Sequence, residues 1–64
     1  MKLNLEANLV APDWFYEQLI ELHRGLTEDQ SLAVNAKLIL LLSNHIGDMG
    51  VLREAMALAR QEVN

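Results

Sequence analysis

Two residues of the sequence could do chemistry together. His45 and Asp48 lie three positions apart in the segment Asn44-His45-Ile46-Gly47-Asp48. A histidine beside a carboxylate can act as a general base or supply half of a metal site. The same pattern is typical of a helix junction, where the histidine faces the negative end of one helix and the aspartate caps the next. Because no nucleophile or third ligand is near, we favour the structural interpretation and assign no catalytic residue.

A second set of potential ligands lies in the first half of the chain. Glu17, Glu21 and His23 are separated by spacings that do not align well on one helix face. A carboxylate metal site would need matching ligands on a second helix, and the central turns of 27–46 offer none. We therefore expect no metal and no cofactor. The isolated glycines are better explained as residues that mark helix ends than as a phosphate-binding loop.

Three consecutive aromatic residues, Trp14, Phe15 and Tyr16, open the first expected helix. Successive side chains on a helix diverge by about 100°, so the three rings cannot all face one small core. Phe15 belongs to an apolar stripe, which leaves Trp14 and Tyr16 on either side of it. Either the residues before this helix fold over Trp14, or it anchors another chain, since aromatic residues concentrate binding energy at interfaces.

The composition narrows the class of protein that could carry these residues. The chain has 64 residues, no cysteine and a formal net charge of −4, and its five basic residues are spread over its length. Disulfides and thiolate metal sites are excluded, and a nucleic-acid role is disfavoured because it needs a basic face. The longest apolar run, 38–42, is far shorter than the roughly 20 residues of a membrane span. With no secretory signal visible, we expect a cytoplasmic protein.

Helix start and stop signals divide the chain into three helical segments. Pro12 suits a first helical turn, Thr27 and Gln30 form a capping box, and Asp48 is a good N-cap. Gly25 and Gly47 serve as stops. We predict an all-α fold, a small three-helix bundle in one domain, 1–64. Its expected parts are an extended N-terminal arm at 1–11 and helices at 12–25, 27–46 and 48–63.

The expected middle helix is apolar around most of its circumference, and such a helix is buried on more than one side. We expect Ile39 and Leu42 to be buried together. Since a chain this small buries only about 60% of its surface, we expect an oligomer. The interface candidates are Trp14, Tyr16, Leu38 and Leu41. The third helix carries an apolar stripe of Leu52, Ala55, Met56, Ala59 and Val63, with Val51 beside it.

These features favour a non-catalytic helical protein-interaction module, either a homodimer or an accessory subunit of a larger enzyme. The alternative is a small-molecule binding protein, for instance for an aromatic acid, with a pocket between helices. Such a pocket needs convergent polar groups in an apolar cavity. Its candidate ligands are Asn35, Asn44 and His45, with Tyr16 as a further supplier.

Six stretches of the sequence resemble a known family, the domain of unknown function 2783. They are Asn8-Leu9 through Pro12-Asp13, Phe15-Tyr16, His23-Arg24-Gly25-Leu26, Asn35-Ala36-Lys37 with the run 38–42, Asn44-His45-Ile46-Gly47-Asp48, and Val51-Leu52-Arg53-Glu54-Ala55. The resemblance implies a short bacterial protein and assigns no catalytic residue. It further implies an accessory role beside a flavin-dependent aromatic hydroxylase, which nothing in the residues themselves indicates.

Overall fold

The computed structural model describes residues 1–63, which contain three helices and no strand. Helix α1 spans Pro12–His23, α2 spans Glu28–Ile46 and α3 spans Met49–Arg60. The predicted all-α class is confirmed. Each helix begins within one residue of its expected start.

The local signals that begin the helices act as the sequence predicts. The Thr27 hydroxyl accepts the Gln30 backbone N–H at 3.2 Å, and the Gln30 side chain accepts the Thr27 N–H at 3.0 Å. The Asp48 carboxylate accepts the Val51 N–H at 3.0 Å. Both caps pair backbone donors that a helix start leaves without an intrahelical partner. The capping box and the Asp48 cap are therefore confirmed.

The ends of two helices come earlier than predicted. The first ends at His23 rather than residue 25, and Gly25 follows with a φ of 76°. The third ends at Arg60, so the expected continuation to residue 63 is wrong. Gln61 leaves the helical region with a ψ of 141°, and Glu62 takes a φ of 64°. Val63 therefore leaves the stripe and is exposed, because these backbone angles turn it away from the apolar face of α3.

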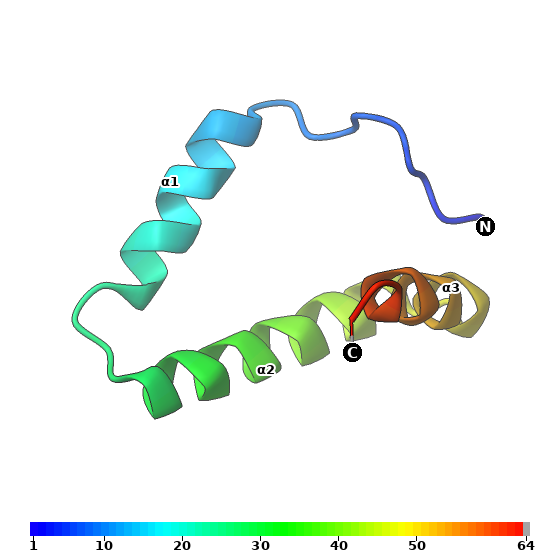
Figure 1. The fold of residues 1–64 in the computed structure, drawn as a ribbon. Coiled ribbons are helices and arrows are strands. Elements are labelled where there is room, and N and C mark those ends of the chain that lie inside the picture. Colours follow the sequence, from blue (N-terminus) through cyan, green and yellow to red (C-terminus); the bar gives the residue numbers. More distant parts are fainter. Residues whose placement is uncertain (64) are drawn as a thin grey trace.

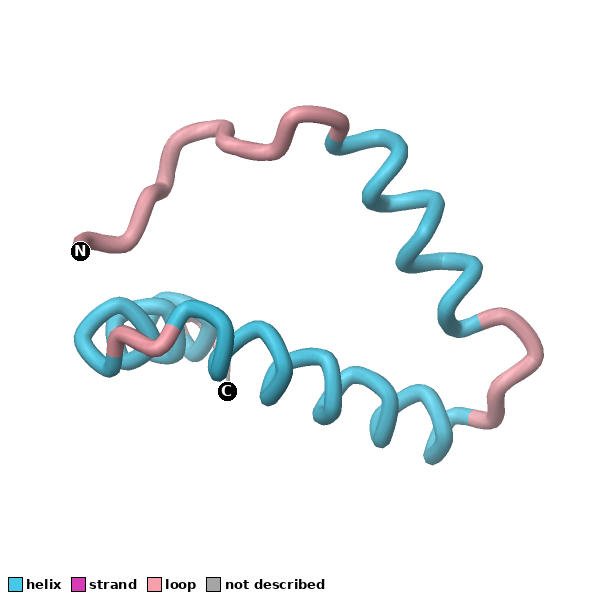
Figure 2. Tube along the Cα trace, turned by 180° about the vertical axis from the view of Figure 1, so that it is seen from behind, coloured by secondary structure: helices cyan, strands magenta, loops and turns pink. Residues whose placement is uncertain are grey.

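The chain follows a wide, open curve (Figure 1). Residues 1–11 are neither helix nor strand and lead into α1, which meets α2 at a corner. A second corner at Gly47, where φ is 69°, turns the chain into α3. Seen from behind, the N-terminal residues again approach α3 (Figure 2). The Met1 amino group lies 3.7 Å from the Asp48 carboxylate there.

Packing between the helices is sparse. Val51, 6% exposed, is the one buried residue within residues 1–63. Ile39 and Leu42 are 62% and 50% exposed, so their predicted burial is wrong for a single chain. The physical reason is the open curve: within the described residues, no helix lies along the middle of α2 to cover it.

The surface area measures how open this arrangement is. The chain exposes 6061 Å², whereas a compact protein of its 7.2 kDa would expose about 4,100 Å². Its radius of gyration is 13.5 Å, against about 10.7 Å for a compact domain of this length. A single chain therefore leaves uncovered about 1,900 Å² that a compact fold would bury.

Candidate functional site

An apolar groove runs between α2 and α3, with a volume of about 480 Å³. Ile39 and Ser43, one helical turn apart, supply its α2 wall, and the serine hydroxyl is its one polar side-chain group. The other wall is formed by Met49, Leu52, Ala55, Met56 and Ala59 of α3. Four of these belong to the apolar stripe predicted from the sequence. The side chains of the two alanines are small, so they leave space between the walls of the groove.

The aromatic opening of α1 is a second uncovered apolar surface. Trp14 is 62% exposed and Tyr16 is 65% exposed, while Phe15 between them is less exposed. Residues 1–11 therefore do not cover Trp14 within one chain, which removes one of the two interpretations drawn from the sequence. Of the other interface candidates, Leu38 is half-buried and Leu41 is 70% exposed.

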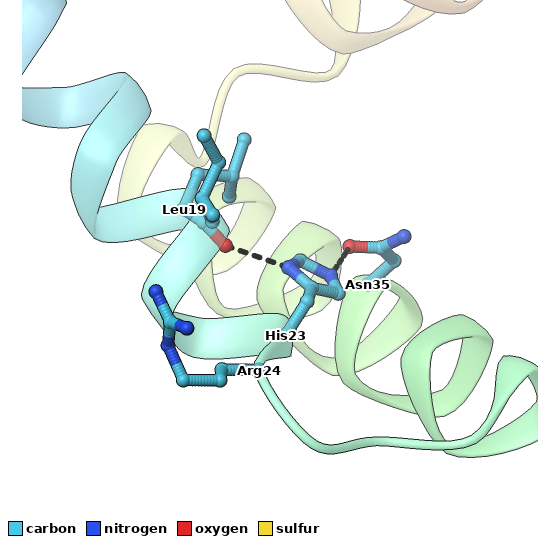
Figure 3. Close-up of a pocket in the computed structure, with 5 residues that line it drawn as sticks. Leu19, His23, Arg24 and Asn35 are labelled. Carbon is cyan, nitrogen blue, oxygen red and sulfur yellow. Dashed lines mark hydrogen bonds between the residues drawn. The ribbon is translucent and has the colours of Figure 1, made fainter.

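A polar bridge joins α1 to α2 at their corner (Figure 3). The ring of His23 lies between the Leu19 carbonyl oxygen, 2.7 Å from Nδ1, and Asn35 Oδ1, 2.7 Å from Nε2. A carbonyl only accepts, so Nδ1 carries a proton and donates to Leu19. Asn35 can serve either form of the ring: its oxygen accepts from an imidazolium, and its amide turned over donates to a neutral Nε2.

The same corner holds a shallow, open hollow of about 550 Å³, lined by Leu19, Ile20, His23, Arg24 and Asn35. Its charged group is already paired. The Arg24 guanidinium lies 2.5 Å from the Glu21 carboxylate, and this hydrogen bond raises the pKa of Arg24. The side chains of His23, Arg24 and Asn35 that line the hollow each already make a hydrogen bond to another residue of the chain.

The structure does not gather the ligand candidates predicted from the sequence. Asn35 lines the hollow, but Asn44, His45 and Tyr16 do not. All three are exposed. They therefore form no convergent polar set with Asn35.

His45 and Asp48 lie at the α2–α3 corner, where the backbone closes the end of α2. The Gly47 N–H donates to the Ser43 carbonyl at 2.8 Å, and Asp48 caps α3. The Val51 N–H, and then the Met1 amino group, hold the pKa of Asp48 below its ordinary value. Within residues 1–63, no three histidine, cysteine or acidic side chains lie close enough to hold a metal ion.

Sequence reasoning missed the His23–Asn35 bridge. Asn35 carried a signal that could have found it, as a polar residue within the apolar part of the expected second helix. An amide among apolar residues of a helix is a candidate for a side-chain hydrogen bond to a neighbouring element. The last turn of the preceding helix, joined by a short connection, is the nearest place to look for one.

Comparison with known proteins gives one match. A family model described as "Protein of unknown function (DUF2783)" matches residues 3–61. No curated protein and no solved structure matches the chain. None of the helices in residues 1–63 has the length and apolar character needed to cross a membrane.

Proposed function

The chain belongs to the DUF2783 family of proteins of unknown function, and from its exposed apolar surface we propose that it is a non-catalytic helical protein-interaction module. Its working state is an oligomer of this chain. The observation that carries the proposal is the uncovered area of about 1,900 Å² on a single chain.

The size of that area fits a stable interface. A standard interface buries about 800 Å² on each partner, and obligate homodimers bury considerably more. Obligate homodimers often have no stable folded monomer. A chain with one buried residue among those described fits that class, because its helices need apolar contacts from elsewhere to stay in place.

The site chemistry supports binding rather than catalysis. The groove is apolar, and His23, Arg24 and Asp48 are engaged in hydrogen bonds or ion pairs that explain their positions. The small-molecule alternative finds less support, since its candidate residues lie apart. In the accessory-subunit version, a larger enzyme, such as a flavin-dependent aromatic hydroxylase, would cover the same surface. We place the module in the bacterial cytoplasm, in keeping with its lack of cysteine.

Sedimentation equilibrium at micromolar concentrations tests the proposal. We expect a mass of at least twice 7.2 kDa. A melting temperature that rises with protein concentration would accompany it, because association stabilises the folded form. A monomer with a cooperative, concentration-independent melt would refute self-association.

A further inference from the structure

Resting on the proposed self-association, we propose that the groove between α2 and α3 receives α1 of a second copy of this chain. Tyr16 and Ile20 of that helix enter the groove. Asp13 and Glu17 beside them face Arg53 and Arg60 on its rim.

The first observation is the shape and character of the two surfaces. A helix that docks in a groove presents apolar residues three or four positions apart. Tyr16 and Ile20 have this spacing on α1 and both are exposed. The groove is lined almost wholly by apolar side chains. In one chain, α1 and α3 lie apart in both views, so a chain's own α1 does not fill its groove (Figures 1 and 2).

The second observation is charge. Arg53 and Arg60 are seven residues apart on α3, hence on one face and about 10.5 Å apart along the axis. Met56, which lines the groove, lies on that face between them. On α1, Asp13 and Glu17 are four residues apart and flank the stripe of Tyr16 and Ile20. An acidic edge on the entering helix thus meets a basic rim on the groove.

The third observation is area and symmetry. Two copies that exchange α1 make the same contact twice, which closes a two-fold dimer and leaves no free groove. Each chain then contributes both a helix and a groove to the interface. The surplus of about 1,900 Å² per chain is large enough for both, since a standard interface needs about 800 Å² from each partner.

Charge reversal on each side tests this contact in the full-length protein. One variant carries Asp13→Lys and Glu17→Lys, and the other carries Arg53→Glu and Arg60→Glu; all four residues are exposed. Each variant alone places like charges at both contacts, so we expect association about tenfold weaker by sedimentation equilibrium at 0.15 M salt. Mixed in equal amounts, each variant's α1 matches the other's groove. We therefore expect a mixed dimer with an association constant near that of the unaltered protein.

General charge attraction needs its own control. The chain has a formal net charge of −4, and reversing two arginines lowers it by four. Lys2→Glu with Lys37→Glu makes the same change at two residues that do not line the groove. Mixed with the α1 variant, this control matches only one of the two contacts, because its own groove keeps both arginines, so we expect a mixed dimer weaker than that of the two charge-reversed variants. Because Asp13 lies in the first turn of α1, Glu17→Lys alone repeats the rescue with that turn intact.

The outcomes separate this contact from the proposed function. An unaltered protein that is monomeric refutes self-association, and with it this contact. An unaltered oligomer whose charge-reversed variants associate as tightly as before refutes the contact alone. The contact is also refuted if the two variants fail to rescue each other, or if the lysine control rescues equally well.

Discussion

The two corners of the chain are built differently. The α1–α2 corner is held by polar contacts: the His23 bridge to Asn35 and the capping box of Thr27 and Gln30. The α2–α3 corner has an N-cap as well, but it also holds Val51, the one buried residue within residues 1–63, and the apolar groove. Hydrogen bonds fix a direction but each contributes only about 1 kcal/mol net. Apolar burial supplies most of the stability of a fold, so the second corner should dominate both stability and association.

Placing a charge in the groove should produce the largest effect. Ile39→Asp puts a carboxylate where we expect a partner helix, so association should weaken by at least 100-fold, or about 2.7 kcal/mol. Sedimentation equilibrium measures it. Lys37→Asp is the matched control, since residue 37 is about 200° away around α2 and should leave association intact. If Ile39→Asp associates normally, the groove is not part of the interface.

Truncating the buried side chain of Val51 at the second corner should have the next largest effect. Val51→Ala loses two buried methyl groups' worth of apolar contact and should destabilise the protein by about 2 kcal/mol. Urea unfolding at fixed protein concentration measures the loss. Val63→Ala, at an exposed position outside α3, is the control and should change stability by less than about 0.5 kcal/mol. If the two variants are equally stable, apolar burial at the α2–α3 corner is not the main contribution to the stability of the fold.

The polar bridge at the first corner should contribute less. A double-mutant cycle of His23→Ala and Asn35→Ala should give a coupling energy of about 1 kcal/mol. His45→Gln serves as the control: this exposed histidine in the last turn of α2 should tolerate the change with the fold and association kept. A coupling energy near zero would mean that the His23–Asn35 hydrogen bond does not hold the corner.

Acid should weaken the second corner through the cap on α3. The pKa of Asp48 is lowered in the folded state, chiefly by the Val51 N–H, from an ordinary value of 3.8. A lowered pKa means that this contribution is fully present above pH 3.8 and is lost as the pH falls through the lower folded value. The melting temperature should therefore fall as the pH is lowered from 5 to 2. Asp48→Asn keeps a side-chain oxygen for the cap and should flatten that part of the curve; an unchanged slope would contradict this role.

The sequence was a good guide to local structure and a poor guide to packing within one chain. Pro12, Thr27, Gly47 and Asp48 predicted the helix ends because each signal acts through neighbouring backbone groups. The predicted burial of Ile39 and Leu42 failed for the single chain, since periodicity identifies an apolar face without saying what covers it. Most of the groove could be predicted from the stripe on α3.

The first corner could not be predicted in the same way. The His23–Asn35 bridge depends on the angle at which α1 meets α2, and residues 24–27 do not specify that angle by any turn pattern. A polar pair twelve positions apart has no periodic signal of its own. For Trp14 the sequence left two interpretations open, since divergent aromatic side chains put at least one ring at the edge without saying whether residues 1–11 cover it; in one chain they do not.

Fluorescence of Trp14, the only tryptophan in the sequence, tests most directly whether a second copy covers the exposed surface. In one chain the side chain is 62% exposed. Burial of Trp14 by a second copy predicts blue-shifted emission at high protein concentration that moves to the red on dilution below the dissociation constant. Trp14→Ala should then weaken association by more than about 1 kcal/mol. Emission typical of a solvated tryptophan at every concentration, with no change on dilution, would contradict the covering of Trp14 by a second copy.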